Sequence, residues 1–518
     1  MRHLKKHILT GLLILFLIPV KAQLYWVVLT DKANTSFNPY EYFNEKAIER
    51  RNNLGISLYD STDFPLNLSY VEEIEKIAGS IIGESRWLNA VSVKADIKTI
   101  KKVSSLPFVY EVREATMTTT AARAKEVEVK DDLESLMEEQ INSMQGNLFI
   151  ENNIDGKGTR IAIFDAGFPG VDKLEAFKHL RDNNQIVATY DFVKKKEDVY
   201  KYNSHGTKVL SCIGGKYGNK KTGLATGAEF LLARTEVALE PYSEEVNWME
   251  AVEWADKNGA DIINSSLGYT KHRYKKGQMD GKTSFVVKAA NLAAKKGILV
   301  VNAIGNDGND EWEFLGTPAD ADSIISVGGI DPNTGYHIYF SSYGPTADKR
   351  LKPNVSAYGK VAFPGDKKTS SIFGTSFSSP LVAGFAACAL QLNPDWSNME
   401  LFHEIEKSGS LYPYFDYAHG YGIPQASYFL ADSTENAQPS FSFNIDEGFV
   451  NVSVDTTLIE ENHNILYYHI ENEEGYLKKY AVIKVYQKDV ISFRKEDLAG
   501  CILRVHFNGY TESLKNLN

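Results

Sequence analysis

Cysteine is scarce in this sequence. Only three of the 518 residues are cysteines, and they stand at Cys212, Cys388 and Cys501. Such an odd and sparse set does not make a disulfide framework. Small apolar residues flank Cys212 and Cys388, so we expect buried free thiols, and no cysteine has a histidine or a helix start beside it that would activate it. The folded state must therefore be stabilised by its hydrophobic core.

An excess of positive charge is also missing. The chain has 56 Lys and Arg against 67 Asp and Glu, a net charge of −11. Because phosphate contacts need clustered Lys and Arg, this balance argues against a general nucleic-acid-binding protein. The hydrophobic content of 43% and the aromatic content of 12% exclude a disordered chain. At this length, two to four domains are expected.

Long hydrophobic runs are limited to the N-terminus. Residues 8–20 form an apolar run of 13 residues that contains a proline and is short for a membrane span. Basic residues precede the run, and small residues at 20 and 22 follow it, which predicts a signal peptide over residues 1–22. The alternative is a permanent N-terminal anchor. We expect a secreted or cell-surface protein with no stable membrane span.

Hydrophobic periodicity predicts a small α/β domain over residues 23–115. Strands are expected at 24–29, 88–93 and 108–112, and helices at 40–51, 71–78 and 97–103, the last capped by Asp96. From residue 116 to 140 the composition changes to Thr, Ala and charged residues, as in an exposed and cleavable linker.

Residues 141–432 alternate between apolar strands and helices. Strands are expected at 160–164, 261–264, 298–301 and 324–327, and helices at 244–257 and 284–296. Strands that are apolar on both faces predict a parallel sheet between two layers of helices. Ligands of such folds gather at the carboxyl ends of the strands, where Asp165 and Asn306 stand.

The last segment, residues 437–518, follows a polar stretch. Alternating hydrophobic residues at 449–454, 480–486 and 502–507 indicate strands. We expect a small β-sandwich.

Four short segments contain the residue types of nucleophilic catalysis. They are Ile-Phe-Asp-Ala-Gly at 163–167, Asn-Ser-His-Gly-Thr at 203–207, Ala-Ile-Gly-Asn-Asp-Gly at 303–308 and Gly-Thr-Ser-Phe-Ser-Ser-Pro at 374–380. The last segment places Ser376 where a helix begins, because Pro380 is expected in a first turn.

The chemistry explains why these residue types belong together. A serine hydroxyl such as that of Ser376 is a weak nucleophile until a base removes its proton, and His205 titrates in a suitable range. Asp165 would fix the imidazole tautomer and balance its charge. The Asn306 amide and the backbone N–H of Ser376 would bind the oxyanion that forms on the attacked carbonyl.

Together these segments resemble the subtilisin-like (S8) serine peptidases. The order Asp, His, Ser matches that family and differs from the chymotrypsin and α/β-hydrolase orders. The resemblance covers about residues 140–430. It implies a subtilisin-like three-layer fold and a secreted endopeptidase that hydrolyses polypeptides through an acyl-enzyme, with Asp165, His205 and Ser376 as the triad and Asn306 as the oxyanion donor.

The resemblance extends to substrate binding. Ser265, Ser266, Leu267 and Gly268 are similar to the strand that pairs with an extended substrate backbone in the family. Gly316 stands near the specificity pocket, and its missing side chain suggests room for a large substrate residue. The segment at 340–345 is also similar.

The sequence departs from the family pattern at two positions. Ala166 stands where Ser or Thr is usual, and Lys208 replaces a common histidine, so we expect altered rate or pH dependence and retained function. Other histidines, such as His272 and His403, are expected on the surface or in the core. No metal-ligand spacing is found, no cofactor is required, and the calcium sites frequent in the family have no motif here.

The flanking parts carry two further resemblances. Residues 23–115 look like a subtilase prodomain, an intramolecular inhibitor that is cut away, with cleavage expected between residues 118 and 140. The alternative is an accessory domain that is never removed. Gly-Tyr at 475–476, the segment at 497–505 and Ser-Leu-Lys at 513–515 resemble the C-terminal sorting domains of type IX secretion. Cys501 replaces a usual aromatic residue, and an ordinary β-sandwich that binds substrate or cell wall is the alternative.

A function from a different class stays open at this point. A catalytically inactive cell-surface binding protein could use the same scaffold. All members of the proposed triad are present, which favours the enzyme.

Overall fold

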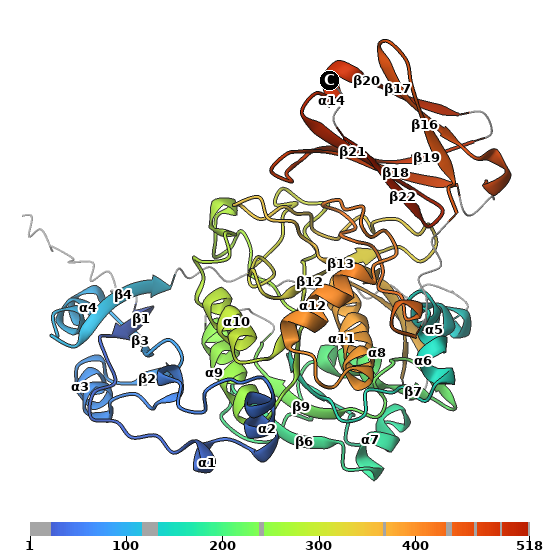
Figure 1. Ribbon diagram of the computed structural model, residues 1–518. Coiled ribbons are helices and arrows are strands. Elements are labelled where there is room, and N and C mark those ends of the chain that lie inside the picture. Colours follow the sequence, from blue (N-terminus) through green and yellow to red (C-terminus); the bar gives the residue numbers. More distant parts are fainter. Residues whose placement is uncertain are drawn as a thin grey trace, which may run out of the picture.

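The computed structural model describes residues 22–115, 133–237, 243–365, 369–430, 438–459, 464–486 and 489–515. Figure 1 shows three folded parts, which are called here the N-terminal domain (22–115), the central domain (133–430) and the C-terminal domain (438–515). The predicted fold class is confirmed: a large parallel sheet lies between helices, a small α/β domain precedes it and two antiparallel sheets follow it. Residues 1–21 of the proposed signal peptide and most of the linker lie outside the described residues.

The N-terminal domain is built on a four-stranded antiparallel sheet in the order β2-β3-β1-β4. Its strands are β1 (Gln23–Leu29), β2 (Ile81–Ser85), β3 (Ala90–Ala95) and β4 (Val109–Ala115), and its helices are α3 (Leu68–Ala78) and α4 (Ile97–Ser104). Asp96 caps α4 through a hydrogen bond from Thr99 N, as the sequence predicts. The segment between β1 and α3, residues 30–67, is called here the arm. The arm contains α1 (Pro39–Tyr42), α2 (Glu45–Asn53) and the 3-10 turn η1 (Ser61–Asp63).

The central domain contains a seven-stranded parallel sheet in the order β13-β12-β11-β10-β5-β9-β6. The strands are β5 (Arg160–Asp165), β6 (Ile186–Asp191), β9 (Glu229–Arg234), β10 (Ile262–Ser265), β11 (Leu299–Ala303), β12 (Ile325–Ile330) and β13 (Val355–Tyr358). Alternate residues face opposite layers, because successive side chains of a strand point to opposite faces. In β5, Ile161 and Ile163 join one core, and Ala162 and Phe164 join the other.

Helices cover both faces of this sheet. One layer contains α8 (His205–Gly214), α11 (Thr375–Leu392) and α12 (Asn398–Lys407), and the other contains α9 (Ser243–Lys257) and α10 (Phe285–Lys295). Short elements complete the domain: α6 (Gly146–Glu151), η2 (Glu175–Phe177), α7 (Lys178–Asp182), η3 (Lys276–Gln278), α13 (Ser427–Leu430) and the hairpins β7 (Lys216–Tyr217) with β8 (Lys220–Lys221) and β14 (Lys360–Pro364) with β15 (Thr369–Phe373). Helix α11 is long and apolar enough to cross a membrane, but 83% of it is buried, as expected of a core helix.

The expected linker is shorter than the composition indicates. Helix α5 (Leu133–Asn142) occupies its last eight residues, because Leu136, Met137 and Ile141 are buried in the core of the central domain. The charged residues of this segment form the exposed face of an amphipathic helix. The prediction of a linker up to residue 140 is therefore wrong for residues 133–140.

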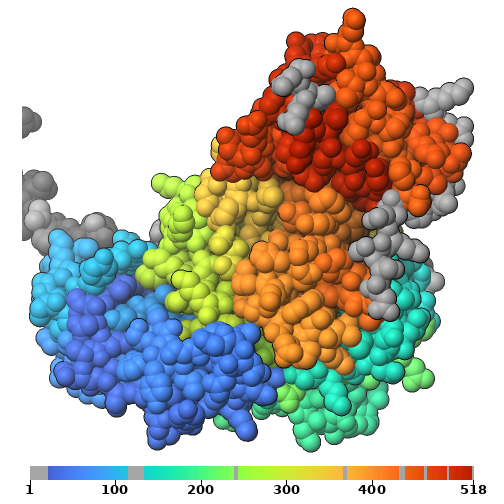
Figure 2. Space-filling view, viewed as in Figure 1, coloured from blue at the N-terminus to red at the C-terminus, as the bar shows by residue number. Residues whose placement is uncertain are grey.

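The C-terminal domain is a sandwich of two antiparallel sheets, β16-β17-β20 and β19-β18-β21-β22, as expected. Its elements are β16 (Phe441–Ile445), β17 (Phe449–Val454), η4 (Thr456–Leu458), β18 (Ile465–Asn472), β19 (Leu477–Lys484), β20 (Val490–Arg494), α14 (Lys495–Leu498), β21 (Cys501–Phe507) and β22 (Tyr510–Leu514). The sandwich rests on the central domain (Figure 2). The His469 ring stacks on Tyr414, with ring centroids 5.1 Å apart, and its Nδ1 lies 2.5 Å from the Phe415 carbonyl oxygen.

Cys212 and Cys388 are free and buried, as the sequence predicts, and Cys501 is free and buried as well. Burial raises the pKa of the Cys212 thiol to about 12, so the thiolate does not form near neutral pH.

Candidate active site

Asp165 is the last residue of β5 and is fully buried. Its Oδ1 accepts a hydrogen bond from the backbone N–H of Ala166 at 2.7 Å, and its backbone carbonyl accepts one from Thr235 N at 2.9 Å. The Arg234 side chain donates to the Ala166 carbonyl at 3.1 Å. Ala166 has no side-chain hydroxyl to donate to the Asp165 carboxylate, but its backbone N–H does so.

His205 is the first residue of α8. The Asn203 side chain accepts its backbone N–H at 2.9 Å, and its Nδ1 lies 2.9 Å from both carboxylate oxygens of Asp165. A side chain at position 206 would prevent this approach, because a Cβ on Gly206 would lie 2.6 Å from the Gly167 carbonyl oxygen and 2.9 Å from the Asp165 Cβ. Glycine after the histidine therefore lets the helix start against the strand end.

The environment of the His205 ring favours its charged form. Burial lowers the pKa of the imidazole, but the negative charge and the hydrogen bond of Asp165 raise it more, so the pKa lies above the usual 6.5. Nδ1 is held by Asp165, and Nε2 has no hydrogen-bond partner in the part of the chain that the structure describes. The ring lies beside Phe377, with centroids 5.3 Å apart, at the start of α11. Nε2 is thus the nitrogen that remains for proton transfer.

Ser376 is the second residue of α11 and is 7% exposed. Pro380 is the sixth residue of the helix, so the prediction that it stands in the first turn is wrong. A proline at this position has no N–H for the Ser376 carbonyl four residues earlier. The Ser266 hydroxyl donates to that carbonyl at 2.9 Å and compensates for the missing helical bond.

Asn306 lies in the loop after β11 and faces the same helix start. Its Oδ1 accepts hydrogen bonds from the backbone N–H of Thr375 at 2.8 Å and from the Thr375 hydroxyl at 3.0 Å. With the oxygen held in this way, the amide group presents its Nδ2 donors to the start of α11. Ser342 fixes the loop, because its Oγ accepts Asp307 N at 3.0 Å and its N–H donates to the Gly305 carbonyl at 3.0 Å.

The segment predicted to bind substrate continues from β10. Sheet pairing of β10 ends at Ser265, whose Oγ accepts Trp248 Nε1 at 3.0 Å. The Ser266 hydroxyl donates to the Ser376 carbonyl in α11, so both serine hydroxyls are hydrogen-bonded inside the protein. Leu267 and Gly268 follow beyond the last sheet pair. Any role of this segment in substrate binding would therefore rest on its backbone.

Gly316 faces this segment. A Cβ built on Gly268 would lie 3.9 Å from the Gly316 Cα, and one built on Gly316 would lie 3.0 Å from Thr270 Cγ2. The two glycines therefore keep the space between their backbones free of side chains. Tyr269 and Thr317 exchange backbone hydrogen bonds of 2.9 and 3.0 Å directly beside them.

Local motifs did not reveal every residue that supports the site. Thr375 is part of the Gly-Thr-Ser segment, but its bond to Asn306 joins residues that are 69 positions apart. Ser342 lies in the segment 340–345 that resembles the family, but its role in fixing the Asn306 loop was not predicted. Arg234 and Asn264, whose Oδ1 accepts the Ser379 hydroxyl at 2.9 Å, have no sequence signal. Within the described residues, no group of three or more His, Cys, Asp or Glu could hold a metal ion.

The arrangement contains the residue types that acyl transfer needs, but no hydrogen bond joins the Ser376 hydroxyl to the His205 ring within the described residues. It brings to the carboxyl edge of the sheet a carboxylate-bound imidazole, a hydroxyl at a helix N-terminus and an oriented amide donor. Such a set matches the requirements for a serine nucleophile with an oxyanion site.

Comparison with known families supports this interpretation. Residues 156–422 match the subtilase family, and residues 24–131 match the peptidase S8 propeptide domain of Bacteroidota. The second match confirms the prediction that the N-terminal domain resembles a prodomain.

Individual relatives are more distant. Alkaline elastase YaB of Bacillus sp. (strain YaB) is 29% identical over 272 residues, which are 52% of this chain and 64% of the relative. M-protease of Shouchella clausii (strain KSM-K16) is 24% identical, over 66% of this chain and 80% of the relative. Among solved structures, the epidermin leader peptide processing serine protease of Staphylococcus aureus superposes with a TM-score of 0.57 at 17% identity, over 81% of this chain and all of that chain. This last likeness shows the fold alone.

Proposed function

The chain belongs to the subtilase family, and from this membership we propose that it is a secreted serine endopeptidase that hydrolyses peptide bonds of polypeptides. The observation that carries the proposal is the 2.9 Å contact of Asp165 with His205 Nδ1, which leaves Nε2 as the proton acceptor beside the start of α11. Ser376 is the proposed nucleophile.

In the proposed mechanism, His205 Nε2 takes the proton of the Ser376 hydroxyl as Oγ attacks the substrate carbonyl. Asp165 holds the imidazole in the required tautomer and stabilises the imidazolium. His205 then gives its proton to the leaving amine, which departs and leaves an acyl-enzyme on Ser376. A water molecule, activated in the same way, hydrolyses the acyl-enzyme.

The oxyanion would be bound by two donors. The first is Asn306 Nδ2, because Thr375 occupies the amide oxygen. The second is the backbone N–H of Ser376, which has no intrahelical acceptor at the second position of α11. Both donors are fixed before the reaction, so little reorganisation is needed as the charge develops.

The proposed substrate is an extended polypeptide that pairs with the backbone of Ser265, Ser266, Leu267 and Gly268. The proposal assigns the side chain before the scissile bond to the space beside Gly268 and Gly316. The basic, apolar and small-residue pattern of residues 1–22 supports export by a signal peptide. No step needs a cofactor.

The activity proposal is tested by comparing wild-type protein with Ser376→Ala on a peptide library. Cleavage products from the wild type alone support it. Equal cleavage by both proteins, or cleavage by neither, would contradict it, and the second result would favour the binding protein on an inactive scaffold.

The N-terminal domain is proposed to be an inhibitory propeptide. The match of residues 24–131 to a propeptide domain supports this role. Cleavage by the enzyme itself is expected between residues 118 and 132, the part of the predicted cleavage region that precedes α5. Equal masses of purified wild-type protein and Ser376→Ala would contradict self-processing and favour a permanent accessory domain.

The C-terminal domain is proposed to be a type IX sorting signal. The proposal is supported by the sequence resemblance of residues 475–476, 497–505 and 513–515 and by the β-sandwich that carries them. Removal of residues 437–518 is expected to abolish release into the medium. Normal release of the truncated protein would favour a sandwich that binds substrate or cell wall.

A further inference from the structure

The arm, residues 30–67, extends from the sheet of the N-terminal domain and contacts the central domain. Its helix α2 lies against the loops that follow α9 and α10. The backbone N–H of Asn44 donates to the carbonyl of Lys257, the last residue of α9, at 2.8 Å. A Cβ on Gly259 would lie 2.9 Å from Ala47 N, and one on Gly297 would lie 2.5 Å from Leu54 Cδ1. Both glycines have positive φ and end a helix, and they also let the arm approach closely.

Cations of the arm meet the negative ends of these two helices. Arg50 pairs with Asp256 in the last turn of α9 and donates to the carbonyl of Lys296, which directly follows α10, and to that of Ala260, three residues after α9. Lys46 lies 2.6 Å from the Gly158 carbonyl oxygen and 3.1 Å from Asp261. Positive charge is favourable at a helix C-terminus, because the last carbonyls have no intrahelical donor.

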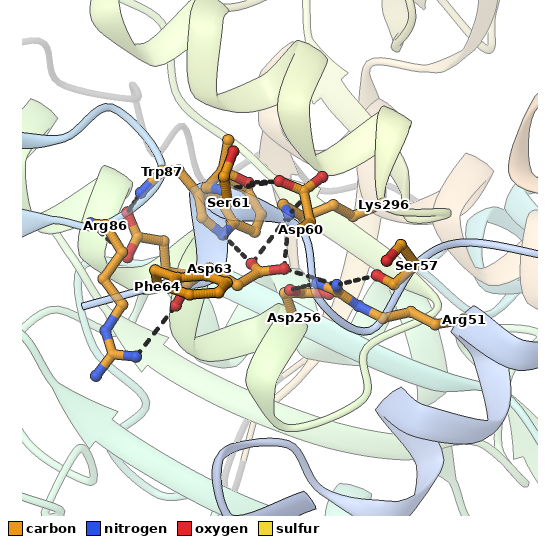
Figure 3. Close-up of polar contacts among 12 residues, drawn as sticks. Arg51, Ser57, Asp60, Ser61, Asp63, Phe64, Arg86, Trp87, Asp256 and Lys296 are labelled. Carbon is orange, nitrogen blue, oxygen red and sulfur yellow. Dashed lines mark hydrogen bonds and ion pairs between the residues drawn. The ribbon is translucent and has the colours of Figure 1, made fainter. Parts of the chain in front are cut away.

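Four charged side chains form a buried network across the boundary (Figure 3). Arg51 lies 2.7 Å from Asp63 within the arm and 2.5 Å from Asp256 of α9. Lys296 of the central domain lies 2.9 Å from Asp63. All four side chains are at most 2% exposed. Buried charges are tolerated only when they are paired, so the network is complete only while the arm stays in place.

The sheet of the N-terminal domain makes a second, apolar contact. Trp26 is fully buried, and its ring centroid lies 5.3 Å from that of Phe285 in α10. Leu24, Trp26 and Trp87 share one hydrophobic core with Val246 and Met249 of α9. A continuous core of this kind is typical of permanent interfaces. Neither contact involves the linker after β4.

We propose that the arm is a second, independent anchor of the N-terminal domain. Its binding site on the central domain is formed by the C-terminal ends of α9 and α10 with Asp256 and Lys296. The occupant is the arm of the same chain, and it holds the N-terminal domain on the enzyme after the linker is cut. The proposal does not depend on Ser376 being the nucleophile.

The test uses the Ser376→Ala chain with a recognition site for an added protease inserted between residues 116 and 132. After the cut, the two fragments are separated by gel filtration, and a dilution series gives their dissociation constant. We expect co-elution. Arg51→Met is expected to raise the dissociation constant by about two to three powers of ten, because it breaks a buried ionic network. Lys178→Gln, which removes a distant exposed ion pair, is the control.

A second, milder variant keeps the test decisive if Arg51→Met does not fold. Lys46→Ala removes the partly exposed edge of the anchor and is expected to raise the dissociation constant about two- to fivefold. Separate elution of the wild-type fragments would overturn the proposal. The proposal would also be overturned if the fragments of Arg51→Met bound each other as tightly as those of Lys178→Gln. If Arg51→Met does not fold, the same comparison is made with Lys46→Ala.

Discussion

Two histidine–aspartate pairs of the molecule have the same contact between the imidazole Nδ1 and both oxygens of the carboxylate. His205 Nδ1 lies 2.9 Å from both oxygens of Asp165, and His419 Nδ1 lies 3.0 Å from both oxygens of Asp416. Both carboxylates are fully buried. The pairs differ at Nε2. His419 Nε2 accepts the backbone N–H of His337 at 2.9 Å, whereas His205 Nε2 has no partner among the described residues.

This difference shows that the pair alone does not make a catalytic base. A ring nitrogen that already accepts a hydrogen bond cannot take a proton without breaking it. The His419 pair is therefore structural, and it ties the segment at 414–419 to His337. The His205 side chain is 17% exposed and that of His419 is 5% exposed, which fits the same division of roles.

The largest effect is expected from removing the reactive imidazole. His205→Ala should lower kcat by about six powers of ten, as typical of losing the base of such a triad. Steady-state kinetics on a cleaved peptide measures the loss. The matched variant His419→Ala should keep kcat within about threefold, because its ring only supports the fold. Equal losses in both variants would remove the distinction between the two pairs.

A smaller loss is expected from Asp165→Asn. The amide keeps the shape but favours the wrong imidazole tautomer, so kcat should fall by about four powers of ten. Asp416→Asn provides the corresponding change in the other pair, and its kcat should stay close to that of wild type. Unchanged turnover in Asp165→Asn would show that His205 acts without its carboxylate.

The oxyanion donor comes next. Asn306→Ala should lower kcat by about two to three powers of ten with little change in KM, because the donor acts on charge that develops in the transition state. Thr375→Val removes only the hydroxyl that holds the Asn306 oxygen, and a loss of about tenfold or less is expected. A mainly KM effect of Asn306→Ala would assign the residue to substrate binding.

For the structural pair the expected effect is on stability. His419→Ala should reduce the free energy of unfolding by about 3 kcal/mol, the low end for a broken buried pair. Asp416 would still accept the Tyr414 hydroxyl at 2.8 Å and the backbone N–H groups of Ala418 and His419. Thermal unfolding of the Ser376→Ala background gives the value. An unchanged melting temperature would contradict the structural role.

The smallest expected effect is a displacement of the pH profile. The pKa of His205 is raised, so the neutral base form requires a higher pH than an ordinary imidazole does. The acidic limb of kcat/KM should therefore have its midpoint above pH 6.5, and activity should fall as the pH decreases through it. A midpoint below pH 6.5 would indicate that burial outweighs the charge of Asp165.

Short motifs in the sequence led to the prediction of Asp165, His205, Ser376 and Asn306 as site residues. Each stands in a segment whose glycine or proline neighbours mark a strand end or a helix start. The His419 pair escaped prediction because its local pattern, Asp-Tyr-Ala-His, gives no indication of what caps Nε2. His337 lies 82 residues away. The position of Pro380 in the helix was mispredicted for a similar reason. The hydroxyl that replaces its missing N–H belongs to Ser266, which is 110 residues from Ser376.

The fold was predictable where hydrophobic periodicity was strong, as in β5, α9 and α10. Charged clusters were less accessible. Arg51 and Asp256 are 205 positions apart, and Asp63 and Lys296 are 233 apart. Exposed and buried charges look the same in a sequence, so only the structure shows that the arm contributes to a shared ionic network.

Labelling with a fluorophosphonate reports on the activation of Ser376 by His205 Nε2, because only an activated serine reacts. Mass spectrometry of the labelled, linker-cleaved protein should find one adduct, on Ser376, in wild type and in His419→Ala, and none in His205→Ala. An adduct on another residue, no adduct on the wild type, or equal labelling of His205→Ala would show that His205 does not activate Ser376.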